Sequence, residues 1–188
     1  MRWHDLFADL EAQASSLERA EQETEVADRT RAELGQVSLI NRLRAVVEQP
    51  AALLVTGSGW ISGEVSALGA DWILLRTPEE LIVRSAAVMA ARELPPRSVS
   101  PHGVGVVAGR LTLASALRAV AIDRAAVTIV LTDGSELTGT PDRVGADWLD
   151  VALHDVGDAP RRSAVRSRMT VSYQHLASVR RRTSGWEA

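Results

Sequence analysis

The chain has 188 residues, with 21 basic residues, 24 acidic residues and a formal net charge of −3. Its hydrophobic content of 46% is sufficient for buried cores, so we expect a folded, soluble protein. The sequence has no cysteine, which excludes disulfides and thiolate metal sites. No run approaches 18 apolar residues and the first residues carry acids instead of an apolar signal core, so we expect a cytoplasmic protein without a membrane partner.

Residues 1–34 are predicted to form an acidic amphipathic helix. Its apolar positions recur at alternating spacings of three and four residues, and its other faces carry many glutamates. A solitary helix of this kind needs a partner to bury its apolar stripe. The apolar stripe could pack against a β-barrel of the same chain, or against the same helix of a second subunit. The second alternative predicts a homodimer through the terminal cluster Trp3, Leu6, Phe7 and Leu10.

The rest of the chain contains an internal repeat at a constant offset of 76 residues. Thr56, Gly63 and the tetrapeptide Gly69–Trp72 recur as Thr132, Gly139 and Gly145–Trp148. Such self-similarity predicts a repeated unit of folding. Within each copy of the repeat, apolar and other residues alternate with a period of two, and Gly or Asp-Gly interrupts the alternation. This pattern is typical of short antiparallel strands.

Each copy is predicted to begin with a helix and to continue as five short strands. The helices are expected at 37–47 and around 113–123. The strands of the first copy are expected at 52–56, 60–67, 70–76, 81–84 and 87–90, and those of the second at 127–131, 136–140, 147–153, 169–173 and 176–179.

One helix followed by five short bent strands is the pattern of a small barrel, and it resembles the Sm-like fold, whose members bind RNA as rings or act as protein adaptors. The predicted fold class is therefore α+β, with two tandem helix-led small antiparallel β-barrels (Sm-like or SH3-like) after the N-terminal helix. The RNA-binding loop of Sm proteins is replaced here by Gly-Ala-Asp-Trp, which argues against base recognition of the Sm type. The expected domains are the helix 1–34, the first barrel 35–92, a Pro/Gly linker 93–111, the second barrel with a basic hairpin 112–182 and a tail 183–188.

Over nearly its whole length the chain also resembles conserved actinobacterial proteins. These proteins open like MRWHDLFADLEAQ and carry two GADW-type repeats. Some of them are labelled Fis-family regulators, so the resemblance implies a regulatory role.

Two sets of residues are candidate contact sites. Trp72 and Trp148 could stack on bases or pack the repeats together, and we expect packing because a large apolar ring is seldom left in water. Asp71 and Asp147 are expected to hydrogen-bond within their own turns. A segment without acids is the candidate surface for a protein partner or for nucleic acid, and its arginines are Arg161, Arg162, Arg166, Arg168, Arg180, Arg181 and Arg182.

The sequence shows no catalytic pattern. Its four histidines are far apart, and it contains neither a P-loop nor a nucleophile elbow, so we expect no catalytic residues, no metal and no cofactor. The predicted function is that of a non-enzymatic binding or adaptor protein that acts in regulation through protein–protein contacts. The alternative is an RNA- or DNA-associated regulator that binds through the Arg-rich second barrel.

Overall fold

A computed structural model describes residues 3–99, 110–154 and 167–181, without the side chains of residues 3–10, 12, 14 and 20. The chain divides into two compact units, residues 1–38 and residues 39–188. The predicted tail 183–188 and part of the predicted linker 93–111 lie outside the described residues.

The first unit consists of one long helix, α1 (Trp3–Leu34). It ends where Gly35 N–H donates to the Arg31 carbonyl at 3.0 Å. Its large described apolar side chains are exposed, with Leu17 at 66% and Val26 at 65%, whereas Ala27 is half-buried. Most of the described part of the predicted apolar stripe is therefore open to solvent. No described helix is both long and apolar enough to cross a membrane.

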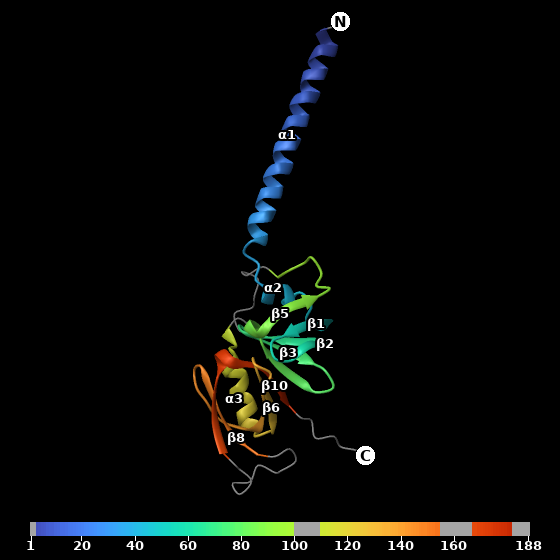
Figure 1. The fold of residues 1–188 in the computed structure, drawn as a ribbon. Helices are drawn as coiled ribbons and strands as arrows, with labels where there is room; N and C mark the ends of the chain where they lie inside the picture. The colour runs from blue at the N-terminus through green and yellow to red at the C-terminus, as the bar shows by residue number, and fades with distance from the viewer. Residues whose placement is uncertain (1–2, 100–109, 155–166, 182–188) are drawn as a thin grey trace. The chain divides into compact units, whose positions relative to one another are not determined.

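The second unit is built on one antiparallel sheet of ten strands, in the order β5-β1-β2-β3-β4-β10-β6-β7-β8-β9 (Figure 1). The order fifth, first, second, third and fourth strand thus occurs twice. Two α-helices, α2 (Leu39–Arg44) and α3 (Leu113–Asp123), precede the two sets of strands. The first set is β1 (Pro50–Val55), β2 (Gly59–Leu68), β3 (Trp72–Arg76), β4 (Glu80–Arg84) and β5 (Val88–Arg92). The second is β6 (Val127–Leu131), β7 (Glu136–Val144), β8 (Trp148–Leu153), β9 (Ser167–Ser172) and β10 (Leu176–Arg181).

The broad α+β class is confirmed, but the prediction of two tandem closed barrels is wrong. Strand β10 pairs with β4 on one edge, with Ser178 opposite Val83, and with β6 on its other edge. Because both edges of β10 are occupied, the two sets of strands merge into one open sheet that ends at β5 and β9. A period of two determines which face of a strand is buried but does not determine which strand is its neighbour, so the sequence pattern could not reveal this pairing.

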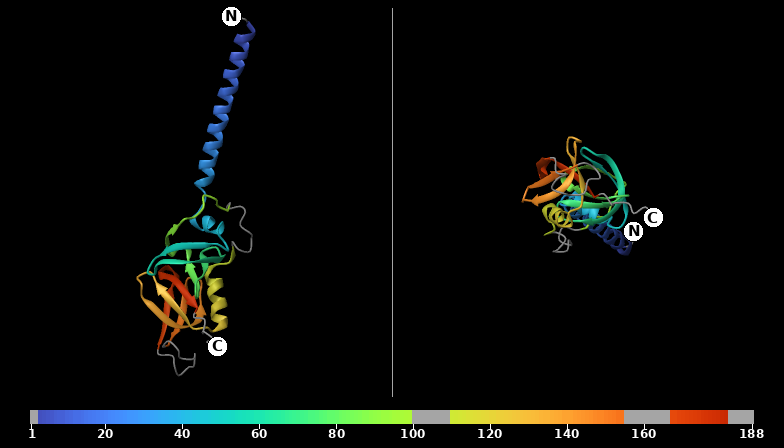
Figure 2. Two further views of the ribbon diagram at one scale, coloured as in Figure 1. Left: turned by 90° about the vertical axis from the view of Figure 1, so that its right-hand side faces the viewer. Right: turned by 90° about the horizontal axis from the view of Figure 1, so that it is seen from below.

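The strands at the junction carry apolar side chains on both faces. In β4, Leu81 and Val83 belong to one hydrophobic cluster, while Ile82 packs against the other. In β10, Val179 lies opposite Ile82 and belongs to the second cluster. Ala177 lies at a break in the register with β6 and belongs to the first cluster. Successive side chains of a strand point to opposite faces, so the strongly curved sheet separates two cores at this point (Figure 2).

The first Gly-Ala-Asp-Trp turn holds the start of α3. The Asp71 carboxylate accepts a hydrogen bond from Leu113 N–H at 2.6 Å. The backbone N–H of Ala70 and the indole N–H of Trp72 both donate to the Leu111 carbonyl, at 2.8 and 3.0 Å. The Asp71 side chain thus bonds a residue 42 positions away instead of its own turn. A carboxylate at this position also interacts favourably with the positive end of the helix dipole.

Helix α3 completes the second core. Its side chains Leu113 and Leu117 are fully buried in the second cluster. The helix lies alongside the strands of the second set (Figures 1 and 2). The contacts of Asp71 therefore join the first set of strands to the helix that covers the second.

We predict that Asp71→Ala destabilises the protein by about 1 kcal/mol, because the substitution removes the carboxylate at the start of α3. Urea unfolding monitored by tryptophan fluorescence measures this change. The matched control is Asp147→Ala at the equivalent turn, where the aspartate is exposed and we expect no loss of stability. Equal effects of the two substitutions would contradict this role of Asp71.

Candidate functional site

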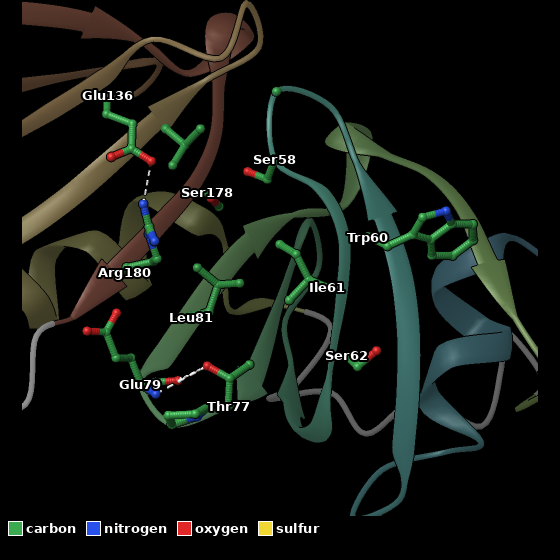
Figure 3. Close-up of a pocket in the computed structure, with 13 residues that line it drawn as sticks. Ser58, Trp60, Ile61, Ser62, Thr77, Glu79, Leu81, Glu136, Ser178 and Arg180 are labelled. Carbon is green, nitrogen blue, oxygen red and sulfur yellow. Dashed lines mark hydrogen bonds and ion pairs between the residues drawn. The ribbon is translucent and has the colours of Figure 1, made fainter.

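A groove lies where the two sets of strands meet (Figure 3), with a volume of about 580 Å³. The first set contributes the β1–β2 turn, β2, the β3–β4 turn and β4, and the second contributes residues of β6, β7 and β10. The residues that line the groove are Gly57, Ser58, Trp60, Ile61, Ser62, Thr77, Pro78, Glu79, Leu81, Val130, Glu136, Ser178 and Arg180.

Two turns are in direct contact at the border of the groove. Gly57 has φ +75°, and a β-carbon there would lie 2.2 Å from the Leu131 carbonyl oxygen and 3.0 Å from Gly134 N. Only glycine fits this conformation and this close approach. The β1–β2 turn therefore lies directly against the β6–β7 turn, which fixes the position of the neighbouring Ser58.

Three polar atoms of the groove have no hydrogen-bond partner in the described part of the chain: Ser58 Oγ, Ser178 Oγ and Arg180 Nε. Ser178 is only 1% exposed. Buried polar groups in folded proteins are nearly always hydrogen-bonded, and leaving one unpaired costs about 1–3 kcal/mol. Three unpaired atoms beside one groove make it the candidate binding site. Each of these atoms is buried, so a ligand contacts it only when the surrounding side chains move.

Charged and apolar groups surround these atoms. The Arg180 guanidinium forms an ion pair with Glu136, with side chains 38% and 56% exposed. On the other side of the groove, Thr77 Oγ donates to the Glu79 carbonyl at 2.6 Å and accepts from Glu79 N–H at 3.2 Å, which orders the β3–β4 turn. Ile61 forms part of the apolar wall (Figure 3). The lining of the groove thus contains one arginine, Arg180, and two glutamates, Glu79 and Glu136.

The described residues contain no group of three or more His, Cys, Asp or Glu side chains that could hold a metal ion. His154 is 5% exposed, and its Nε2 lies 3.0 Å from Thr140 Oγ in a hydrogen bond.

The structure brings one of the seven predicted contact arginines into the groove, which is Arg180. Arg168 lies 3.7 Å from Asp142. Arg181 pairs with Asp123 at 2.5 Å and with Glu80 at 3.9 Å. The remaining members of the set, Arg161, Arg162, Arg166 and Arg182, lie outside the described residues.

The two predicted tryptophans have different surroundings. Trp72, from the first set of strands, packs against the second hydrophobic cluster. Both rings lie on their own turns, since a β-carbon would be 2.0 Å from the Trp72 indole at Gly69 and 2.4 Å from the Trp148 indole at Gly145. Only Trp72 also packs against that cluster among the described residues. The predicted dimer cluster lies in α1, and its side chains are outside the described part: Trp3, Leu6, Phe7 and Leu10.

Sequence reasoning did not identify Ser58 and Ser178 as site residues. Ser178 carried a signal, because it is a polar residue between Ala177 and Val179 in a strand that is otherwise buried at its centre. The sequence around Ser58 gave no signal of a binding site, since serine is common in Gly-rich turns.

Comparison with known proteins gives no relative from which a function could be transferred. No family model matches the chain. No match was found among the curated proteins or among the solved structures.

We predict that Ser178→Ala increases the free energy of unfolding by about 1 kcal/mol, because it removes a buried hydroxyl that has no partner. Thermal or urea unfolding tests this. The matched control is Ser66→Ala, because Ser66 Oγ donates to the Leu74 carbonyl at 3.3 Å and its removal should bring no gain. A loss of stability in Ser178→Ala would show that the hydroxyl is paired.

Proposed function

We propose that the protein is a non-enzymatic binding or adaptor protein that acts in regulation through protein–protein contacts. The observation that carries this proposal is the groove, in which three unpaired polar atoms lie beside apolar side chains. An extended polypeptide segment offers a donor and an acceptor at every residue together with alternating side chains. Such a segment could therefore hydrogen-bond to the polar atoms of the groove and pack against its apolar side chains at the same time.

The donors and acceptors of the groove define how such a segment would bind. Arg180 Nε is only a donor, so it requires an acceptor such as a backbone carbonyl. The hydroxyls of Ser58 and Ser178 can donate or accept and can therefore bind either backbone group. Glu79 and Glu136 outnumber Arg180, which favours a basic side chain on the ligand.

The described arginines support a protein partner over nucleic acid. Arg168, Arg180 and Arg181 each form an ion pair with an acidic side chain of the same chain. A surface that binds phosphates needs arginines that are free to replace counterions. The nucleic-acid alternative therefore depends on Arg161, Arg162, Arg166 and Arg182, outside the described part, and it stays a prediction.

Three further expectations also stay predictions. They are the homodimer through α1, the absence of catalysis and the cytoplasmic location.

The test is selection of peptides from a phage-displayed random library against the full-length protein. We expect the selected peptides to contain a basic residue beside an apolar one. Their affinity should fall about tenfold in Ser178→Ala, the equivalent of about 1.4 kcal/mol, since the substitution removes a hydrogen-bonding group from the groove.

Ser66→Ala serves as the control and should bind the selected peptides as the wild type does. Selection of no peptide, or of peptides that bind both variants equally, would contradict the groove as the contact site. Binding of a single-stranded oligonucleotide that disappears at moderate salt would favour the nucleic-acid alternative instead.

A further inference from the structure

The second Gly-Ala-Asp-Trp turn has the same backbone structure as the first. Gly145 N–H donates to the Trp148 carbonyl at 2.9 Å, as Gly69 N–H donates to the Trp72 carbonyl at 3.0 Å. Each turn is also bonded to the residue that follows the fourth strand of its set. Tyr173 N–H donates to the Asp147 carbonyl at 2.8 Å, and the equivalent distance in the first turn is 2.9 Å.

Side-chain contacts hold the second turn in place. The Trp148 ring lies so close to Gly145 that a β-carbon there would be 2.4 Å from it. The Tyr173 hydroxyl donates to the Gly145 carbonyl at 3.3 Å. Burial raises the pKa of Tyr173 above its ordinary value, so this hydroxyl keeps its proton to a higher pH than an exposed tyrosine does. The turn is therefore preorganised before any partner binds.

The two turns differ in what they hold. In the first, the Ala70 N–H, the Asp71 carboxylate and the Trp72 indole N–H bind the start of α3. Their counterparts in the second turn are the Ala146 N–H, the Asp147 carboxylate and the Trp148 indole N–H. None of these three groups has a hydrogen-bond partner in residues 3–99, 110–154 or 167–181, and Ala146 and Asp147 are exposed.

We propose that the turn Gly145–Trp148 is a docking site for the start of an α-helix on a partner protein. The contacts of the first turn show the required chemistry. A carbonyl just before the helix would accept from Ala146 N–H and from the Trp148 indole, and the N–H of the first helical residue would donate to Asp147. The negative carboxylate would also complement the positive end of the incoming helix. This second contact surface lies beyond the peptide groove and would allow the protein to hold two partners.

The proposed occupant is a helix of a different protein, because neither α-helix described in residues 39–99, 110–154 and 167–181 offers a suitable free start. The start of α3 is already held by Asp71. Helix α2 has only six residues. Docking of a second copy through its α1 is an outcome that the experiment distinguishes.

The test uses a synthetic peptide that copies residues 110–124, the segment that contains α3, with blocked ends and a staple on the side of the helix away from Leu113 and Leu117. Its affinity for the full-length protein is measured by fluorescence anisotropy of a label on the peptide. We expect Asp147→Ala to weaken binding about tenfold, because a charge-assisted hydrogen bond is lost. A peptide N-methylated at the position of Leu113 lacks the donor and should bind the wild type with the same reduced affinity.

Asp142→Ala is the control for the loss of one exposed negative charge, and it should bind the peptide as the wild type does. The proposal is overturned if the peptide does not bind, or if it binds wild type and Asp147→Ala equally. Self-association of the wild type that Asp147→Ala abolishes would also overturn it, since the occupant would then be a second copy. The groove is separate, so peptides selected for it should bind Asp147→Ala normally, and failure of one proposal is distinguishable from failure of the other.

Discussion

The pairing of β4 with β10 is the interaction on which the rest of residues 39–188 depends. It places Leu81 and Val83 in one core and Ile82 in the other, so both cores share these strands. Arg84 strengthens the junction from the side, because its guanidinium donates to the carbonyls of Leu176 at 3.0 Å and Gln174 at 2.9 Å. Separating the two strands would therefore expose apolar surface on both sides of the sheet.

The same pairing creates the groove. Ser178 and Arg180 are two residues apart on β10, so their side chains point to the same face, toward Leu81 of β4. A hydroxyl at this position stabilises neither core, since its oxygen has no partner in the described residues. Sites that bind ligands commonly retain polar groups at some cost in stability. The two halves of the sheet thus join at the groove that we propose as the contact site.

The sequence predicted the strands well and their partners poorly. The strand at 127–131 was predicted with the bounds that it has, since alternation and the Asp133–Gly134 turn are local signals. The β4–β10 pair joins residues about 100 positions apart, and the Asp71–Leu113 bond spans 42 positions, so neither leaves a local pattern. The groove depends on the β4–β10 pairing, which is why Ser178 was missed, whereas Arg180 was found through its charge.

The central claim is that one continuous sheet joins the two repeats through β4 and β10. Nuclear Overhauser effects between backbone protons of these strands in the isotope-labelled protein test it most directly. The account predicts cross-strand contacts between Val83 and Ser178 and between Glu80 and Arg181, in antiparallel register. Contacts of β10 with β9 in place of β4 would show that the second repeat closes on itself, and they would contradict the account.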